Sequence, residues 1–268
     1  ESARERERER NKNGRRRQGK SVTKGSVPAP SRQEKRAMTS STATALLEVS
    51  SRKVHQVESR ACQRKVPHVR QSYNWDCGLA CVLMIVHANG MKHVDLKYLR
   101  ELCGTTSIWT VDIAHLLRHF HLKVKFYTVT LGANPAYADE KFYKEHMQAD
   151  AHRVQQLFKL AQEAGIELCQ RSLGLQELKE VVSTRNNLVL ILVDKHRLSI
   201  PLCCPMLSHS TTYVGHYVLL VDYNYDKSSF SMKDPASYKS TVEVKDSTLE
   251  EARKSFGTDE DVIIVELN

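Results

Sequence analysis

The chain has 268 residues, enough for one large domain or two small ones, and its formal net charge is +9. Residues 1–66 hold 18 Lys and Arg against 7 Asp and Glu, and the remaining 202 residues hold 22 against 24. The basic excess therefore lies in the leader, and we expect no nucleic-acid binding by the folded part. No apolar run reaches the ~18 residues of a membrane span. Seven cysteines without framework-like spacing predict a soluble protein with reduced thiols, cytoplasmic or nucleocytoplasmic.

Residues 1–65 are predicted to be a disordered basic leader, because few large apolar side chains are available to offset chain entropy. The Arg–Glu alternation at 4–10 is what a simple GA nucleotide repeat would encode. We therefore hypothesise a gene-model extension with Met38 as the true start, which N-terminal sequencing of the native protein tests. A nuclear or acidic-surface address is the alternative function for this tail.

Residues 66–268 are predicted to form a single α+β domain, with helices gathered first and antiparallel strands later. In chain order, the pattern predicts helices at about 77–89, 95–104, 110–120, 139–148, 150–164, 175–182 and 247–255. Strands are predicted at 123–130, 166–169, 188–193, 216–221, 230–233 and 262–267. A loop of about twenty residues at 195–214 is long enough to predict a functional role.

Cys77 opens the first of these helices. Gln71 stands six residues before it, Gly78 follows it, and an apolar run continues over 79–86. The unpaired N–H groups and dipole of a helix N-terminus favour a thiolate there, which is a nucleophile if a base lies nearby. The alternative is a small apolar side chain at the start of a core helix.

A base and an orienting acceptor are predicted in the second half of the chain. His216 follows Gly215 at the mouth of a buried strand, and Asp234 ends the neighbouring hairpin strand before Pro235. The hairpin would place the two side by side, so that the carboxylate accepts from the ring N–H and fixes the tautomer. Taken singly, they could be a core-edge histidine and a turn aspartate.

The four residues together predict a thiol-dependent site in a papain-like cysteine peptidase fold, with the cysteine in the helical part and the histidine and aspartate in the antiparallel sheet. His216 follows Cys77 by 139 residues (216 − 77), within the ~130–150 of papain-like peptidases. Gln71 would donate its side-chain amide to an oxyanion beside the backbone N–H of Cys77, and Asp234 would orient His216.

Other candidate sites are weaker. A zinc site in the 195–214 loop would need adjacent cysteines, which are poor chelators: His196, Cys203, Cys204 and His209. Cys81 is predicted to pack rather than to act as a resolving thiol, and Asp76 to cap the helix. The acidic stretch 259–261 is interpreted as an exposed turn rather than a metal site.

The motif set resembles that of papain-like bacteriocin-processing cysteine peptidases, in Gln71, 76–78, Cys81, 215–217 and 234–235. More closely, the chain resembles the plant soluble guanylyl-cyclase-like family, whose animal relative is the guanylyl cyclase domain-containing protein. This second likeness covers about 66–267 and rests on specific segments: VPHVRQ at 66–71, NWDCGLAC at 74–81, SIWTVD at 107–112, TVTLGANP at 128–135, DPA at 234–236 and EEARKSFGTDED at 250–261.

The resemblance leaves three functions open. The residues favour a hydrolase, a cysteine peptidase, isopeptidase or amidase that needs no cofactor and acts on a peptide or protein. The family name implies a guanylyl cyclase that converts GTP to cyclic GMP with Mg²⁺ or Mn²⁺. The chain lacks a Walker-type phosphate loop and an evident two-metal aspartate pair, and 107–112 is interpreted as a helix start with a packed tryptophan. The third function is a catalytically silent module that binds an extended peptide.

Overall fold

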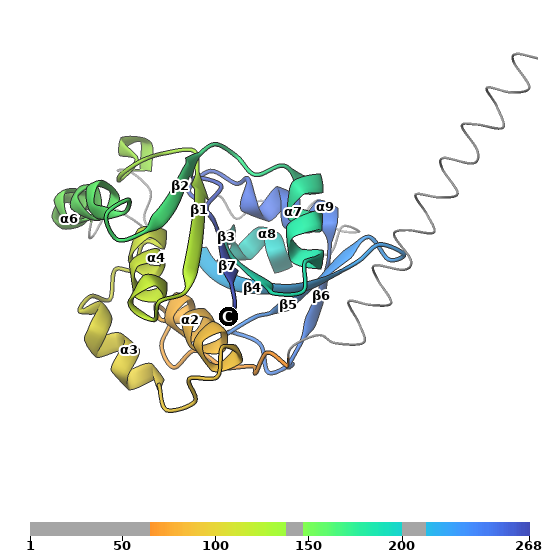
Figure 1. Ribbon diagram of the computed structural model, residues 1–268. Helices are drawn as coiled ribbons and strands as arrows, with labels where there is room; N and C mark the ends of the chain where they lie inside the picture. Colours follow the sequence, from red (N-terminus) through yellow and green to blue (C-terminus); the bar gives the residue numbers. More distant parts are fainter. Residues whose placement is uncertain (1–64, 138–146, 200–212) are drawn as a thin grey trace, which may run out of the picture. The chain divides into compact units, whose positions relative to one another are not determined.

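A seven-stranded mixed sheet forms the centre of the fold. The computed structural model describes residues 65–137, 147–199 and 213–268 (Figure 1). The strand order is β2-β1-β7-β3-β4-β5-β6, and β1 and β2 alone are parallel among its neighbouring pairs. The strands are β1 Lys123–Thr128, β2 Ile166–Gln170, β3 Asn187–Asp194, β4 Gly215–Asn224, β5 Ser229–Lys233, β6 Val242–Lys245 and β7 Val262–Glu266.

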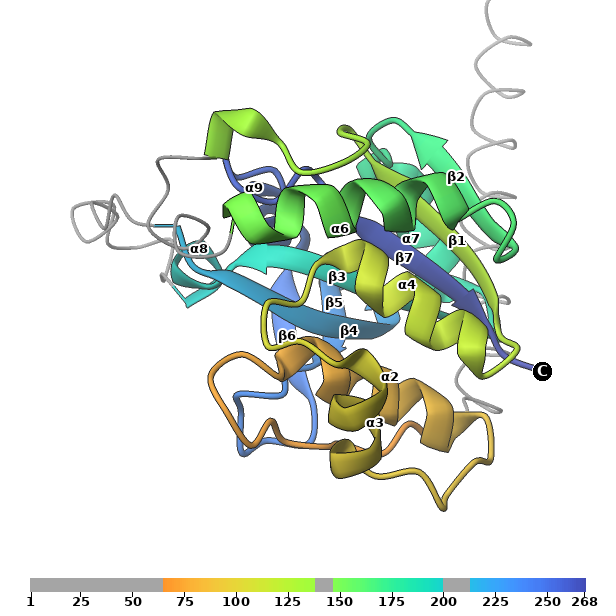
Figure 2. The same cartoon turned by 90° about the vertical axis from the view of Figure 1, so that its left-hand side faces the viewer.

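Helices cover both faces of this sheet, as Figures 1 and 2 show. The face toward the viewer in Figure 2 carries α2 Cys77–Ala88, α3 Leu96–Cys103, α4 Thr110–His119 and α6 Met147–Leu160. The other side carries α7 Leu175–Ser183, α8 Lys195–Ser199 and α9 Asp246–Arg253, and a short 3₁₀ turn spans Pro135–Tyr137. Within the described ranges, no helix has the length and apolar character needed to cross a membrane.

The central strand β3 explains why the sheet is covered on both sides. Seven of its eight residues are buried. Leu190 and Leu192 belong to the core beneath α2 and α4, whereas Val189, Ile191 and Val193 belong to the core beneath α7 and α9. Successive side chains on a strand point to opposite faces, so a continuous apolar run requires a core on each side.

Helix α2 packs between α4 and β4. Ten of its 12 residues are buried. A Cβ atom at Gly78 would lie 2.6 Å from Cδ1 of Ile113 and 3.1 Å from Cδ2 of Tyr217, so a residue without a side chain allows this close approach. One turn after Cys77, the Cys81 Sγ donates to the carbonyl oxygen of Tyr217 at 3.6 Å. The start of α2 is thereby held against the start of β4.

The α+β prediction is confirmed, with helices carrying the cysteine and antiparallel strands leading to the histidine and aspartate. The ends of α3 are also as predicted: the Asp95 carboxylate accepts from the Tyr98 N–H at 2.8 Å, and Gly104 has a φ of +66°.

Three element predictions need correction or fall outside the structure. The segment 195–214 is not all loop, because its first residues form α8, which packs beside α9; residues 200–212 lie outside the described part. Most of the helix predicted at 139–148 also lies outside it, and the next helix begins at Met147 rather than at 150. Strand β6 was missed because its exposed positions are polar and only Val244 is buried.

Candidate active site

Asp76 shapes the segment that leads into Cys77. Its fully buried carboxylate accepts hydrogen bonds from the backbone N–H of Ser72 at 3.0 Å and of Tyr73 at 2.9 Å, and from the Arg100 guanidinium at 3.0 Å. It makes no side-chain cap for α2, so the predicted capping role is wrong. The carboxylate points back into the preceding turn and fixes the approach to Cys77, which is 5% exposed.

His216 and Asp234 lie side by side where β4 begins and β5 has just ended. The pairing of Leu219 with Lys233 brings Asp234 next to the start of β4. His216 Nε2 lies 2.7 Å from Asp234 Oδ1, and the carboxylate also accepts from the Ala236 N–H at 2.8 Å. Burial would raise the pKa of Asp234, but the hydrogen bond and charge of His216 outweigh it and lower this pKa. The carboxylate is therefore ionised and the ring nitrogen donates to it.

Cys77 also interacts with the His216 imidazole. Burial of His216 would lower its pKa, but hydrogen bonds with Asp234 and with Cys77 outweigh burial and raise it to about 9. Because Nε2 is bonded to Asp234, Nδ1 is the ring nitrogen left for the sulfur. The structure thus brings Cys77, His216 and Asp234 together, with the imidazole between the thiol and the carboxylate. Their roles in a reaction remain predictions.

Gln71 lies beside this group but is engaged elsewhere. Its backbone N–H donates to the Pro235 carbonyl at 3.0 Å, and its side-chain Nε2 donates to the Tyr73 carbonyl at 2.7 Å. Its buried Oε1 has no hydrogen-bond partner among the described residues. An oxyanion role therefore remains a prediction, and it requires Nε2 to turn away from Tyr73. Sequence reasoning missed His68, whose Nε2 lies 2.9 Å from the Asp234 carbonyl.

Cys81 is fully buried one turn along α2. Burial raises its pKa well above the ordinary value, and the charges of Cys77 and Asp234 raise it further. A thiol that stays protonated and packed is consistent with a packing role rather than a resolving one. Of the four residues of the predicted zinc site, only His196, in α8, lies in the described part.

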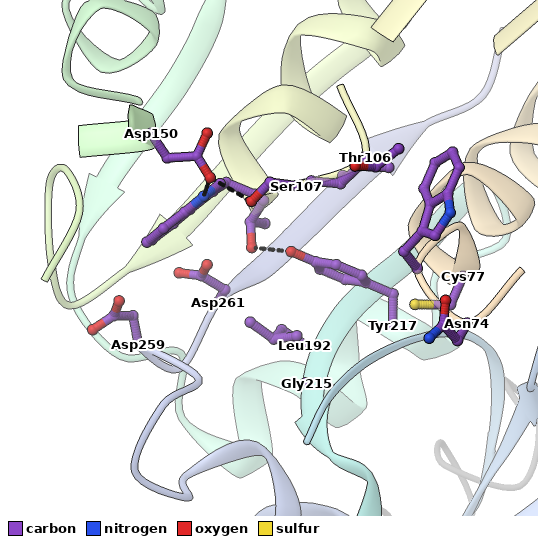
Figure 3. A pocket seen from close by; sticks show the side chains of 14 residues that line it. Asn74, Cys77, Thr106, Ser107, Asp150, Leu192, Gly215, Tyr217, Asp259 and Asp261 are labelled. Carbon is purple, nitrogen blue, oxygen red and sulfur yellow. Dashed lines mark hydrogen bonds between the residues drawn. The ribbon is translucent and has the colours of Figure 1, made fainter. Parts of the chain in front are cut away.

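A cavity of about 330 Å³ opens beside Cys77, and Figure 3 shows the side chains around it. Its lining includes Trp109 and Tyr217 and three acidic residues: Asp150, Asp259 and Asp261. The prediction of an exposed turn at 259–261 is wrong, because Asp259 and Asp261 are each only 8% exposed. Their burial could not be predicted from sequence, since an aspartate-rich turn normally faces solvent.

Comparisons with known proteins place this chain among relatives. The family described as guanylylate cyclase matches residues 66–265. Guanylyl cyclase 1 of Arabidopsis thaliana is 44% identical over 207 residues, which cover 75% of this chain and 76% of that protein. Among solved structures, a C39-like peptidase from Bacillus anthracis is similar with a TM-score of 0.46 and 14% identity, over 76% of this chain and 96% of that chain.

Proposed function

We propose that this chain, which belongs to the guanylylate cyclase family, is a cysteine-dependent acyl-transfer enzyme that hydrolyses an amide or isopeptide bond in a peptide or protein. One observation carries the proposal: the buried His216 ring lies 2.7 Å from Asp234, and interaction with Cys77 is a further cause of its raised pKa. A thiol nucleophile needs a base within reach, and the base needs an acceptor that orients it.

The reaction would proceed in two halves. In the reactive form the Cys77 proton already lies on His216, whose pKa is raised to about 9. The thiolate sulfur attacks the carbonyl carbon, and the carbonyl electron pair moves to oxygen. Collapse of this intermediate breaks the C–N bond, and His216 returns the proton to the leaving amine. Water then attacks the thioester while the neutral His216 accepts its proton. Collapse breaks the C–S bond, releases the carboxylic acid and restores the thiolate beside the imidazolium. Asp234 stabilises the imidazolium throughout, and no cofactor is required.

The oxyanion would be bound by the backbone N–H of Cys77 and the side-chain amide of Gln71. The second donor becomes available when Nε2 leaves the Tyr73 carbonyl, to which it now donates at 2.7 Å. Removing one oxyanion donor typically lowers kcat by about a hundredfold or more. We therefore expect Gln71→Ala to lower turnover by about that factor with little change in KM, measured by steady-state kinetics.

The thiol is tested by labelling the intact protein with iodoacetamide and locating the modified peptide by mass spectrometry. We expect a fast phase at Cys77 that is lost in Cys77→Ala, together with any amide hydrolysis. Cys103→Ala and Cys169→Ala are matched controls, because both remove partly exposed free thiols outside the site and should keep the fast phase. Labelling of Cys77 no faster than that of Cys103 would contradict the proposal.

A guanylyl cyclase is the second candidate, favoured by the family and by the 44% identical relative that carries this name. It would convert GTP to cyclic GMP with Mg²⁺ or Mn²⁺. Cyclic GMP production that persists in Cys77→Ala, without thiol reactivity, would replace the acyl-transfer proposal. A catalytically silent module would show neither reaction yet retain a peptide ligand.

A further inference from the structure

The cavity beside Cys77 has a thiol at one end and acidic side chains at the other. Cys77 and Asn74 lie at one end in Figure 3, and Asp150, Asp259 and Asp261 lie toward the other. Its volume of about 330 Å³ lies at the small end of the range for ligand sites. Because the cavity is small, a ligand that places one group at the acidic end would place its adjoining atoms against the Cys77 thiol.

The Asp150 carboxylate is already hydrogen-bonded by its neighbours, and it shares the charge of Arg153 with Asp112. Its carboxylate accepts from Trp109 Nε1 at 3.0 Å, from Arg153 at 3.0 Å and from the Ser107 hydroxyl. Arg153 also pairs with Asp112 on α4. This aspartate therefore serves to hold the cavity wall and is not available to a ligand.

Asp259 is surrounded by neutral donors. Its Oδ1 accepts from the Thr130 hydroxyl at 2.8 Å, the Asn134 amide at 2.9 Å and the Tyr137 hydroxyl at 2.8 Å. These bonds satisfy the oxygen and leave the negative charge without a counter-ion among them. Asp259 thus contributes negative potential to this end of the cavity.

Asp261 is the acidic residue of the cavity whose hydrogen bonding is incomplete. It is 8% exposed and lines the cavity. Its Oδ1 has no hydrogen-bond partner within 65–137, 147–199 and 213–268. Burial, and then the charge of Asp259, raise its pKa to about 8. In the empty cavity at neutral pH, Asp261 therefore carries a proton. A bound organic cation would pair with the carboxylate and displace that proton, since a buried carboxylate is normally ionised only beside a cation.

The remaining walls suit an organic cation. Trp75, Trp109 and Tyr217 also line the cavity. Aromatic faces attract ammonium and guanidinium groups through the ring quadrupole, and more strongly where water is excluded. Carboxylate and aromatic groups in one small cavity together recognise a positively charged organic group.

We propose that this cavity is a specificity pocket for an ammonium or guanidinium group of the acyl substrate, with Asp261 as its anionic anchor. The assignment rests on the proposed function in one respect, that Cys77 attacks the carbonyl joined to that group. The substrate class is then a peptide or amide with a cationic side chain or end group on the acyl side of the cleaved bond.

Binding is tested without the chemistry, by calorimetry on full-length Cys77→Ala protein with benzamidine and its neutral isostere benzamide. We expect benzamidine to bind about tenfold to a hundredfold more tightly, as a hydrogen bond to a charged group predicts. Asp261→Asn should remove the difference, and Asp226→Asn, an exposed change of the same charge, should keep it. If Asp261→Asn fails to fold, the two probes on Cys77→Ala protein still decide the question.

A second experiment tests whether a cation bound in the pocket brings a substrate to Cys77. It compares two chloroacetamides that differ only in carrying an amidinium or a carboxamide group. We expect the cationic probe to label Cys77 faster in wild type, and the two rates to become equal in Asp261→Asn. Selective benzamidine binding without Cys77 labelling would overturn the acyl-transfer proposal and leave the cation pocket. Equal binding of both isosteres, or Mg²⁺ or Mn²⁺ binding lost with Asp261 instead, would overturn the pocket and leave the thiol chemistry.

Discussion

The charge on His216 sets both the reactivity expected of the site and part of its stability. Its pKa of about 9 lies above the ordinary 6.5, because bonds to Asp234 and Cys77 outweigh burial. A raised pKa in the folded state gives a stabilisation that is complete below about 6.5 and is lost as the pH rises through about 9. The free energy of unfolding should therefore fall over this interval, which urea titrations at several pH values would measure.

Asp234→Asn should lower the pKa of His216, because the amide cannot supply the charge that stabilises the imidazolium. NMR titration of the His216 ring would measure the shift, and the loss of stability should move to lower pH with it. Ser237→Ala serves as a control on the same turn, because the Ser237 hydroxyl accepts from the Lys239 N–H at 3.0 Å. An unchanged His216 pKa in Asp234→Asn would show that the carboxylate is not its main partner.

Positions along the chain were easier to predict at this scale than side-chain directions. Cys77 and His216 were placed correctly at the starts of a helix and a strand, since the flanking apolar runs define those starts. The partners of Gln71, Asp76 and Asp261 could not be predicted. The partner of each side chain depends on its rotamer, which residues distant in the sequence determine. Arg100, for example, hydrogen-bonds the Asp76 carboxylate and orients it away from α2.

Helix α3 buttresses the turn before Cys77 through one ion pair. Arg100 reaches the fully buried Asp76 at 3.0 Å and lies over the Tyr73 ring, 5.1 Å from its centroid. Arg100→Ala would leave a buried carboxylate with backbone donors only. We expect a loss of about 1–3 kcal/mol in the free energy of unfolding, at the lower end for buried pairs because two N–H bonds remain.

Lys97→Ala on the same helix is the matched control, because the Lys97 side chain is 79% exposed and its pair with Glu101 spans 3.9 Å. It should change the free energy of unfolding by less than about 0.5 kcal/mol. Equal effects of the two substitutions in urea unfolding would mean that the buried pair contributes no more than an exposed one.

Elements were predicted best where local chemistry and burial agree. Asp95 and Gly104 mark the ends of α3 by local capping interactions, and β3 is recognised by its apolar run. Strand β6 and helix α8 were missed because they are short and depend on packing against β5 and α9. Such elements lack a local signal strong enough to outweigh a loop.

Across the whole chain, the charge is divided unevenly. Residues 1–66 carry a net +11 and the remaining 202 residues a net −2. We expect the full chain to bind duplex DNA weakly and with steep salt dependence, and a chain of residues 66–268 not to bind it. Fluorescence anisotropy at two salt concentrations would measure this, with calorimetry expected to give both chains the same unfolding midpoint. DNA binding that survives the deletion would place a basic surface in the later residues.

The bonds from His68 to the Asp234 carbonyl and from Gln71 to the Pro235 carbonyl join segments that are 166 and 164 residues apart. During translation, Cys77 leaves the ribosome long before these partners exist. A nascent chain that ends before these residues therefore carries Cys77 without the imidazole of His216 and the carboxylate of Asp234. Until His216 and Asp234 are made, the thiol lacks its proposed base, so the site does not act on the peptide bonds of its own unfinished chain.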